Sequence, residues 1–242
     1  MATQKKIALV TGANRGIGLE ICRQLAGRGL HVILTAREAA KGEVAAAKLR
    51  GEGLDVVSHA LDIQSDASVK ALADWLRATY GRLDILINNA GVLLERIYGK
   101  DANIETDAMD VDVDLVATII DTNTLGPLRT TQKLAPLMPK GGRIINLASQ
   151  MGLKSWANSN MVGYRISKTA LMGLTANLAK GLEKKGVTGN CMCPGWVKTD
   201  MGGPGALITA EQSVTGMRRV IGNLTVEDSG KFYAFDGQMV PW

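Results

Sequence analysis

A chain of 242 residues that is 46% hydrophobic and 21% charged has the composition of a soluble globular protein, which excludes a disordered or fibrous one. No apolar run reaches the roughly 18 residues of a membrane span and the amino terminus is short and polar, so we expect a cytoplasmic protein. The net charge of +5 is spread along the chain without interleaved aromatic residues, which argues against nucleic acid and favours a phosphate-bearing small molecule as partner.

The first half of the chain alternates short apolar runs with helical patterns. Residues 7–10 form an apolar run that ends at Thr11-Gly12, and a helical pattern begins at Ile17. Further strands are predicted at 31–35, 55–60 and 83–88, with helices at 38–50 and 65–79. This alternation predicts a parallel sheet with helices on both faces and right-handed crossovers. Ligands bind at the carboxyl edge of such a sheet.

The second half continues this alternation after a polar, irregular segment at 92–111, which is long enough for a functional loop. Strands are predicted at 143–147, 188–193 and 231–235, and helices around residues 121–124, from Tyr164 to 184 and at 210–223. Residues 201–210 are rich in glycine and small side chains, so we expect the region 196–223 to close over the substrate as a lid. Cys191 and Cys193 face one side of a strand and are interpreted as packing residues.

Three glycines, Gly12, Gly16 and Gly18, follow the first predicted strand. Glycines at this place permit a tight turn and let a pyrophosphate approach the backbone N–H groups at a helix N-terminus. A glycine-rich turn without a ligand is the alternative interpretation. The spacing indicates a dinucleotide-binding loop.

The end of the second strand distinguishes between two dinucleotides. An acidic residue there would hold the adenosine ribose hydroxyls, whereas an arginine accommodates a 2′-phosphate. The sequence reads Thr35-Ala36-Arg37, and Arg15 lies within the glycine loop. Two guanidinium groups that converge on one phosphate favour NADP over NAD, unless both are solvated surface residues.

Tyr164 and Lys168 are four residues apart on a predicted helix, so their side chains project from one face. A nearby ammonium group favours the phenolate and lowers the pKa of a tyrosine. Such a tyrosine acts as a general acid or base. The pair alone also occurs by chance, and it gains meaning from the other motifs.

Together these motifs resemble the short-chain dehydrogenases/reductases over nearly the whole chain, and the carboxyl-terminal residues 229–242 resemble the carbonyl-reductase-like branch. The resemblance implies a single-domain Rossmann-type α/β fold over residues 1–242, with a mostly parallel seven-stranded sheet in the order 3-2-1-4-5-6-7. The motifs that carry it, in family order, are Thr11-Gly12-Ala13-Asn14-Arg15-Gly16-Ile17-Gly18, Asn88-Asn89-Ala90-Gly91, Asn123, Ser149, Tyr164 with Lys168, and Pro194-Gly195.

The resemblance also implies a role for each catalytic position. Tyr164 would donate a proton to the substrate oxygen, and Ser149 would hydrogen-bond that oxygen. Lys168 would hold the nicotinamide ribose and lower the pKa of Tyr164, and Asn123 would support a water chain. Asp62 would contact the adenine and Thr199 the carboxamide. The cofactor-binding positions predicted for NADP(H) are Gly12, Asn14, Arg15, Gly16, Ile17, Gly18, Arg37, Asp62, Ile63, Asn89, Ala90, Gly91, Tyr164, Lys168, Pro194, Gly195, Val197 and Thr199.

The expected activity is the NADPH-dependent reduction of a ketone or aldehyde. An apolar pocket for a bulky carbonyl compound is predicted, with local packing as the alternative, at Trp156, Met161, Trp196 and Met201. A 3-oxoacyl thioester reductase, an epimerase or dehydratase, and a non-catalytic NADP-binding sensor are alternatives, although a sensor has no need of the four catalytic residues.

The chain lacks one feature of some monomeric relatives in this branch. Those relatives carry a long insertion between the catalytic serine and tyrosine, whereas Ser149 and Tyr164 are only 15 positions apart. A helix face that the insertion would cover is then free to pair. We therefore expect a homodimer or homotetramer.

Overall fold

The computed structural model describes residues 5–95 and 107–242, so most of the loop predicted at 92–111 lies outside the described residues. All pairs of neighbouring strands are parallel, and the sheet has the predicted order β3-β2-β1-β4-β5-β6-β7. The predicted fold class is therefore confirmed. The strands are β1 (Ile7–Val10), β2 (His31–Ala36), β3 (Val56–Ala60), β4 (Ile85–Asn88), β5 (Arg143–Leu147), β6 (Thr188–Cys193) and β7 (Phe232–Ala234).

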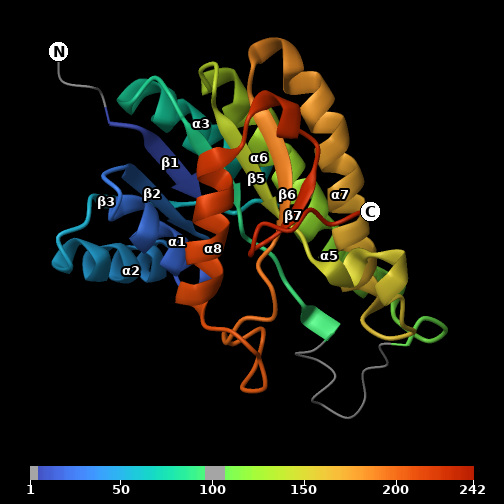
Figure 1. Ribbon diagram of the computed structural model, residues 1–242. Helices are drawn as coiled ribbons and strands as arrows, with labels where there is room; N and C mark the ends of the chain where they lie inside the picture. The colour runs from blue at the N-terminus through green and yellow to red at the C-terminus, as the bar shows by residue number, and fades with distance from the viewer. Residues whose placement is uncertain (1–4, 96–106) are drawn as a thin grey trace.

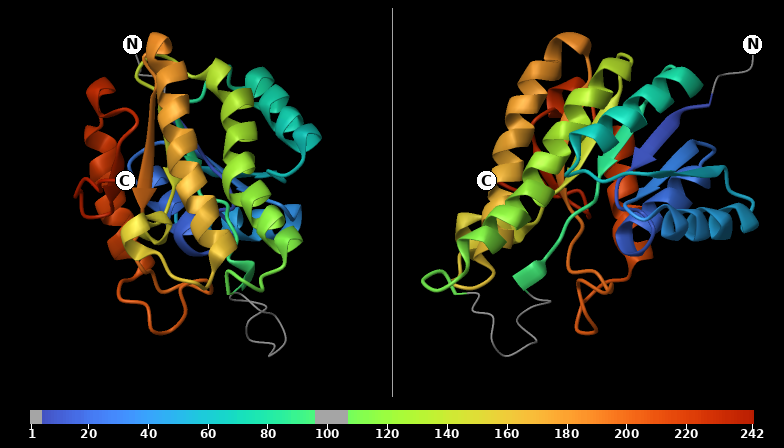
Figure 2. Two further views of the ribbon diagram at one scale, coloured as in Figure 1. Left: turned by 90° about the vertical axis from the view of Figure 1, so that its right-hand side faces the viewer. Right: turned by 180° about the vertical axis from the view of Figure 1, so that it is seen from behind.

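Helices cover both faces of this sheet (Figures 1 and 2). On one face lie α1 (Gly16–Ala26), α2 (Ala39–Gly51) and α8 (Ala210–Asn223). On the other lie α3 (Asp66–Thr79), α5 (Val113–Ile120), α6 (Gly126–Leu134) and α7 (Val162–Leu182). None of the helices in the described parts of the chain is both long and apolar enough to cross a membrane.

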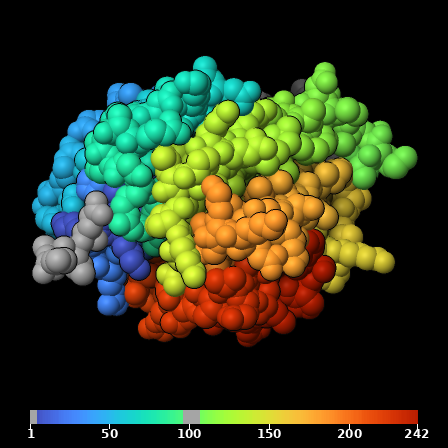
Figure 3. All heavy atoms as spheres, turned by 90° about the horizontal axis from the view of Figure 1, so that it is seen from above, coloured from blue at the N-terminus to red at the C-terminus, as the bar shows by residue number. Residues whose placement is uncertain are grey.

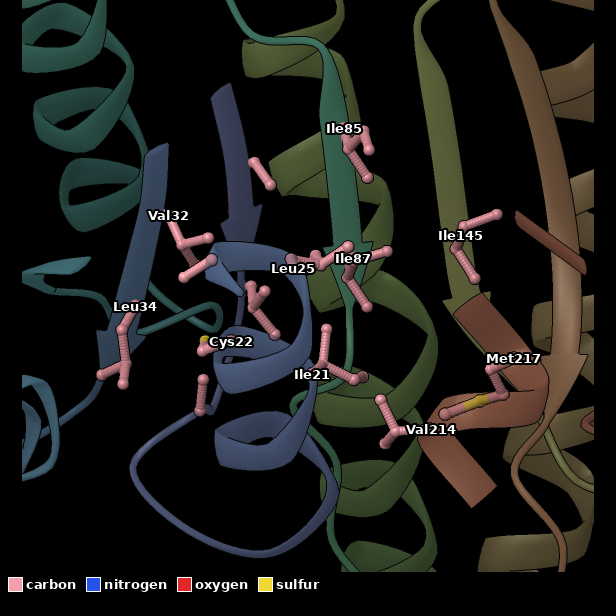
Figure 4. Packing of buried hydrophobic residues seen from close by; sticks show 14 of the residues in the cluster. Ile21, Cys22, Leu25, Val32, Leu34, Ile85, Ile87, Ile145, Val214 and Met217 are labelled. Atoms are coloured by element: carbon pink, nitrogen blue, oxygen red, sulfur yellow. The ribbon is translucent and has the colours of Figure 1, made fainter. Parts of the chain in front are cut away.

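The two largest hydrophobic cores follow from the alternation of side chains along the strands. In β1, Ala8 and Val10 point into the core under α1 and α8, while Ile7 and Leu9 point into the core on the other face. Successive strand residues face opposite sides of a sheet, so an uninterrupted apolar run buries both faces. Figure 4 shows the first core, where Ile21 lies among strand and α8 side chains.

The helix predicted around residues 121–124 has an irregular centre. α5 continues into a π-helical turn, Asp121–Leu125, which leads directly into α6. A π turn holds one more residue than an α turn and is frequent at functional sites. Here it contains Asn123, whose side chain is only 1% exposed. Beside it, a Cβ on Gly126 would lie 2.6 Å from Ile63 Cδ1, so a larger residue at this position would displace the Ile63 side chain.

The segments that follow β4, β5 and β6 hang from the same end of the molecule, the carboxyl edge of the sheet (Figures 1 and 2). Figure 3 looks at the opposite end, where cyan, yellow-green, orange and red segments from distant parts of the chain pack into one surface. The topology thus brings the glycine loop, the residues after β4, Ser149 and the turn after β6 to one edge.

Candidate active site

The glycine loop between β1 and α1 packs closely against the loop after β4. A Cβ on Gly12 would lie 2.8 Å from Ala90 Cα, and one on Gly18 would lie 2.5 Å from Asn89 Nδ2. Gly12 and Gly16 have φ angles of 61° and 57°, which side chains disfavour. No side chain caps the start of α1 at Arg15. The N–H groups at this helix end therefore suit an anionic ligand.

Two polar side chains tie these loops together. Thr11 Oγ1 accepts hydrogen bonds from the backbone N–H groups of Asn89 and Ala90, each at 3.0 Å. In return, Asn89 Nδ2 donates to the carbonyls of Thr11 and Gly12 at 2.8 and 2.9 Å. Thr11 is not among the site residues predicted from the sequence. Its signal was a hydroxyl residue directly before the first loop glycine, because such a group accepts from two amides at once.

The residues predicted for the adenosine end of the cofactor occupy the same edge. Arg15 forms an ion pair with Asp200 at 2.8 Å, with 74% and 77% of the two side chains exposed. Arg37 is exposed directly after β2. Asp62 follows β3, and its Oδ1 accepts from the Gln64 N–H at 3.0 Å. Through its ion pair with Asp200, the Arg15 guanidinium group contacts the segment after β6.

Ser149, Tyr164 and Lys168 come together at the end of β5. The Ser149 and Tyr164 hydroxyls are hydrogen-bonded to each other, and Ser149 Oγ also accepts from the Met151 N–H at 3.2 Å. Lys168 Nζ donates to the Leu147 carbonyl at 2.8 Å and lies 5.5 Å from the centre of the Tyr164 ring. The start of α7 thus holds the phenol and the ammonium group within one helical turn.

Burial sets the charge state of this pair. It raises the pKa of Tyr164 to about 12, although the hydrogen bond with Ser149 acts in the opposite direction. Burial also lowers the pKa of Lys168 from 10.5 to about 8. The predicted lowering of the Tyr164 pKa is therefore not what the structure shows, because desolvation outweighs the hydrogen bond. A phenol with a raised pKa keeps its proton, which is the form a proton donor needs.

Asn123 connects the loop after β4 to the catalytic helix. Its Oδ1 accepts from the Val92 N–H at 2.8 Å, and its Nδ2 donates to the Val92 carbonyl at 2.9 Å and to Ser167 Oγ at 3.0 Å. Ser167 Oγ in turn donates to the Tyr164 carbonyl at 2.7 Å. Ser167 is not among the site residues predicted from the sequence. Its signal was a small polar residue on the buried face of the helix, beside Lys168.

The turn after β6 borders the site on the side predicted to face the nicotinamide. Gly195 has a φ of 80°, and the Pro194 carbonyl accepts from Ser213 Oγ at 2.6 Å. A Cβ on Gly16 would lie 3.4 Å from Thr199 Cγ2, so Thr199 faces the glycine loop. Val197 pairs with Ile208 in a short bridge. The predicted positions after β6 therefore lie beside those after β1.

The predicted substrate positions lie on exposed segments around this site. Trp156, Trp196 and Met201 are 54%, 51% and 41% exposed, and Met161 is half-buried with a φ of 52°. Trp196 is anchored because its Nε1 donates to the Gly202 carbonyl at 2.8 Å. The assignment of these four residues to a substrate pocket stays a prediction.

Arg165 holds one of these segments to the catalytic helix. Its Nη1 donates to the Trp156 carbonyl at 2.6 Å and to the Met151 carbonyl at 3.3 Å, and its Nε donates to the Asn160 carbonyl at 2.9 Å. One side chain next to Tyr164 thereby fixes the backbone of residues 151–160. Arg165 has no role among the predictions from the sequence.

A parallel doubly wound sheet with a glycine loop after β1 and a Ser149–Tyr164–Lys168 set at the same edge defines a dinucleotide-dependent oxidoreductase of the Rossmann class. The sequence model of the short chain dehydrogenase family matches residues 6–206. The chain therefore belongs to the short chain dehydrogenase family, and the predicted membership and enzyme class are confirmed.

Individual relatives agree with this assignment. The chain is 32% identical to short-chain dehydrogenase/reductase 1 of Saponaria officinalis over 287 aligned residues, covering 95% of this chain and 94% of that protein. It is 32% identical to carbonyl reductase (NADPH) 3 of Homo sapiens, with 88% and 89% of the two chains covered. The NADPH-bound carbonyl reductase from chicken fatty liver has a TM-score of 0.85 to it at 31% identity, covering 99% of this chain and 100% of that one.

Proposed function

We propose that this protein reduces a ketone or an aldehyde to an alcohol with NADPH, and that Tyr164 donates the proton to the carbonyl oxygen. The observation that carries the proposal is the hydrogen-bonded Ser149–Tyr164 pair with Lys168 at its side. A hydrogen-bond donor, a proton donor and a cation in one buried site stabilise the negative charge that develops when a carbonyl is reduced.

The predicted cofactor, NADP(H), is confirmed. The similar protein from chicken fatty liver is NADPH-bound, and the human relative is named for NADPH. The site of this chain fits a dinucleotide, because a close glycine loop meets an uncapped helix N-terminus. Bound NADPH supplies the hydride. We assign its contacts to the positions predicted above, with Arg15 and Arg37 for the 2′-phosphate and Lys168 for the nicotinamide ribose.

The chain's own groups handle the proton. Tyr164, with a pKa of about 12, holds its proton at neutral pH until the substrate oxygen becomes a more basic alkoxide. Ser149, oriented by the Met151 N–H, hydrogen-bonds that oxygen. Lys168, with a pKa of about 8, is largely an ammonium group at neutral pH and stabilises the phenolate that remains. Asn123, fixed by Val92, anchors the water chain that returns a proton.

The finer organisation of the protein belongs to the same proposal. Residues 1–242 form one NADP-binding domain, within which residues 196–223 act as the substrate loop. Trp156, Met161, Trp196 and Met201 line the pocket for an apolar carbonyl compound, supported by their position around the catalytic edge. The buried free thiols of Cys22, Cys191 and Cys193, which pack in the cores as expected, suit the cytosol.

Self-association is also part of the proposal. Ala170 and Gly181 are exposed on α7, and a Cβ on Gly173 or Gly181 would meet no atom within 4 Å. The outer face of α7 therefore has small residues that let another helix approach. We expect a homodimer or a homotetramer, which light scattering of the purified protein measures.

Activity assays test the proposed reaction. Loss of reduced-nicotinamide absorbance is followed with NADPH and with NADH, against bulky ketones, aldehydes and a 3-oxoacyl thioester. We expect consumption of NADPH with ketones or aldehydes, and a lower kcat/KM with NADH. A preference for the thioester would replace the proposed substrate class. Tight NADPH binding without turnover of any carbonyl would contradict the proposal and favour a sensor.

A further inference from the structure

Glu95 is a buried carboxylate that no step of the proposed mechanism uses. It lies four residues after Gly91, on the segment that follows β4, and is only 1% exposed. Its Oε1 accepts from the Gly163 N–H at 2.6 Å, and its Oε2 accepts from the Tyr164 N–H at 3.0 Å. Both carboxylate oxygens are therefore used at the first turn of the catalytic helix, one of them on Tyr164 itself.

α7 does not supply this cap from its own sequence. Its N-cap residue, Met161, is in the left-handed conformation and makes no side-chain cap, and the first turn holds no acidic residue. The free N–H groups at a helix start need acceptors, and a carboxylate there also interacts favourably with the helix dipole. Glu95 meets both needs from a segment 68 positions away in the chain.

The surroundings are shaped to admit this carboxylate. A Cβ on Gly163 would lie 3.2 Å from Glu95 Oε1 and 2.9 Å from Ile119 Cδ1. On the side of α5, the neighbours of Gly163 are apolar, Val116 and Ile119. Among the described residues, Arg165 on α7 is a charged group that acts on Glu95. Burial raises the pKa of Glu95, while the two backbone hydrogen bonds and Arg165 lower it.

We propose that Glu95 is a positioning residue for the reduction, because its carboxylate fixes the backbone of Tyr164 relative to the cofactor loop at Asn89-Ala90-Gly91. This inference rests on the proposed function. A second set of hydrogen bonds makes a similar connection, because Asn123 links Val92 through Ser167 to the Tyr164 carbonyl. The backbone N–H and the carbonyl of Tyr164 are thus both tied, by separate side chains, to the segment after β4.

Glu95→Gln tests the carboxylate with little change of shape. The amide NH₂ group would face a backbone N–H, so one of the two hydrogen bonds is lost together with the charge. We expect kcat to fall about tenfold or more, since a small misplacement of a catalytic group is costly, while KM for NADPH stays within about twofold. Glu95→Asp keeps the charge but shortens the reach, so its kcat should lie between those of Glu95→Gln and the wild type.

The matched control is Asp84→Asn. Asp84 is also a buried carboxylate that accepts from a backbone N–H, that of Ile7 at 2.8 Å, but it lies at the amino end of β4, away from the site. All proteins are assayed with NADPH and the best carbonyl substrate, at a temperature at which circular dichroism shows each of them folded. The control should lose stability and keep the wild-type kcat.

A Glu95→Gln protein with a wild-type kcat and a lower melting temperature would overturn the inference, because the cap would then be structural only. If this variant does not fold, Glu95→Asp decides, and an unchanged kcat overturns the inference in the same way. The proposed function would instead be overturned, and the inference with it, if the wild-type protein binds NADPH but shows no turnover that the Tyr164→Phe substitution abolishes.

Discussion

The carboxyl edge of the sheet has two parts that are built differently. We call the part proposed to bind NADPH the cofactor half, and the part proposed to bind the carbonyl compound the substrate half. In the cofactor half, Thr11 and Asn89 lock two loops through backbone groups, and the glycines allow contacts too close for a side chain. In the substrate half, Trp156, Trp196 and Met201 are largely exposed on segments without regular strands or long helices. The fold therefore fixes the proposed cofactor site, while the proposed substrate pocket depends on surface segments that can vary without disturbing the sheet.

The catalytic residues belong to the cofactor half. Tyr164 is tied through its backbone to Glu95 and through Ser167 to Asn123, and Lys168 is tied to Leu147. We therefore expect substitutions in the cofactor half to change kcat or cofactor affinity, and those in the substrate half to change KM for the carbonyl compound. The following predictions test this division.

Apart from the removal of the Tyr164 hydroxyl itself, the largest effect is expected for Lys168→Met. Loss of the ammonium group should lower kcat by about 10²–10³-fold, because the phenolate formed after proton transfer is no longer stabilised. Steady-state kinetics at saturating NADPH measures this. A variant with more than half of the wild-type kcat would remove Lys168 from the mechanism.

The same substitution should increase stability at neutral pH. Burial lowers the pKa of Lys168 from 10.5 to about 8, so keeping its charge in the folded state costs about 3 kcal/mol. The substitution removes this cost, but it also removes the hydrogen bond to Leu147, which reduces the gain by about 1 kcal/mol. The cost is complete below about pH 8 and disappears as the pH rises toward 10.5. Urea unfolding at pH 7 and pH 10 should show the gain at pH 7 only, and an equal gain at both would contradict the burial effect.

Gly12→Ala should weaken the cofactor half next. The added Cβ would lie 2.8 Å from Ala90 Cα at a φ of 61°, and such strain raises the Kd of NADPH about 10–100-fold. Fluorescence titration measures the Kd. Gly51→Ala, where a Cβ meets no atom within 4 Å, is the control and should keep the wild-type Kd. Equal affinity of the two variants would mean that the loop does not hold the cofactor.

Arg37→Asp should change cofactor preference. A carboxylate in place of the guanidinium repels a 2′-phosphate and accepts from ribose hydroxyls, so the ratio of kcat/KM for NADPH to that for NADH should fall about tenfold. Arg28→Asp, at an exposed arginine after α1, should leave the ratio unchanged. If the ratio stays constant in Arg37→Asp, the phosphate is held elsewhere.

The smallest effect is expected in the substrate half, for Arg165→Met. The variant loses the hydrogen bonds to the Met151, Trp156 and Asn160 carbonyls, so the backbone of residues 151–160 is no longer fixed. The KM for the carbonyl compound should therefore rise about threefold, with kcat nearly constant. A large drop in kcat with unchanged KM would place Arg165 with the catalytic residues and break the division.

The sequence predicts the strands and helices better than the contacts between distant segments at the site, for physical reasons. Strands 143–147 and 188–193 and the helix at 210–223 have the predicted bounds, since the apolar pair Ile144-Ile145, the run Cys191-Met192-Cys193 and the cap at Thr209 are local signals. The π turn at Asn123 and the raised pKa of Tyr164 depend on packing between distant segments. The ion pair of Arg15 with Asp200, 185 positions apart, depends on how a surface loop folds back.

The most direct test of the central claim is Tyr164→Phe, which removes one hydroxyl. NADPH is first bound to each protein and followed by fluorescence, then carbonyl substrate is added in a single-turnover experiment. We predict an unchanged Kd for NADPH and a rate of NADPH oxidation lower by at least about 10³-fold, because the proton donor is lost. Oxidation of NADPH at the wild-type rate in Tyr164→Phe would contradict the assignment of Tyr164 as the acid.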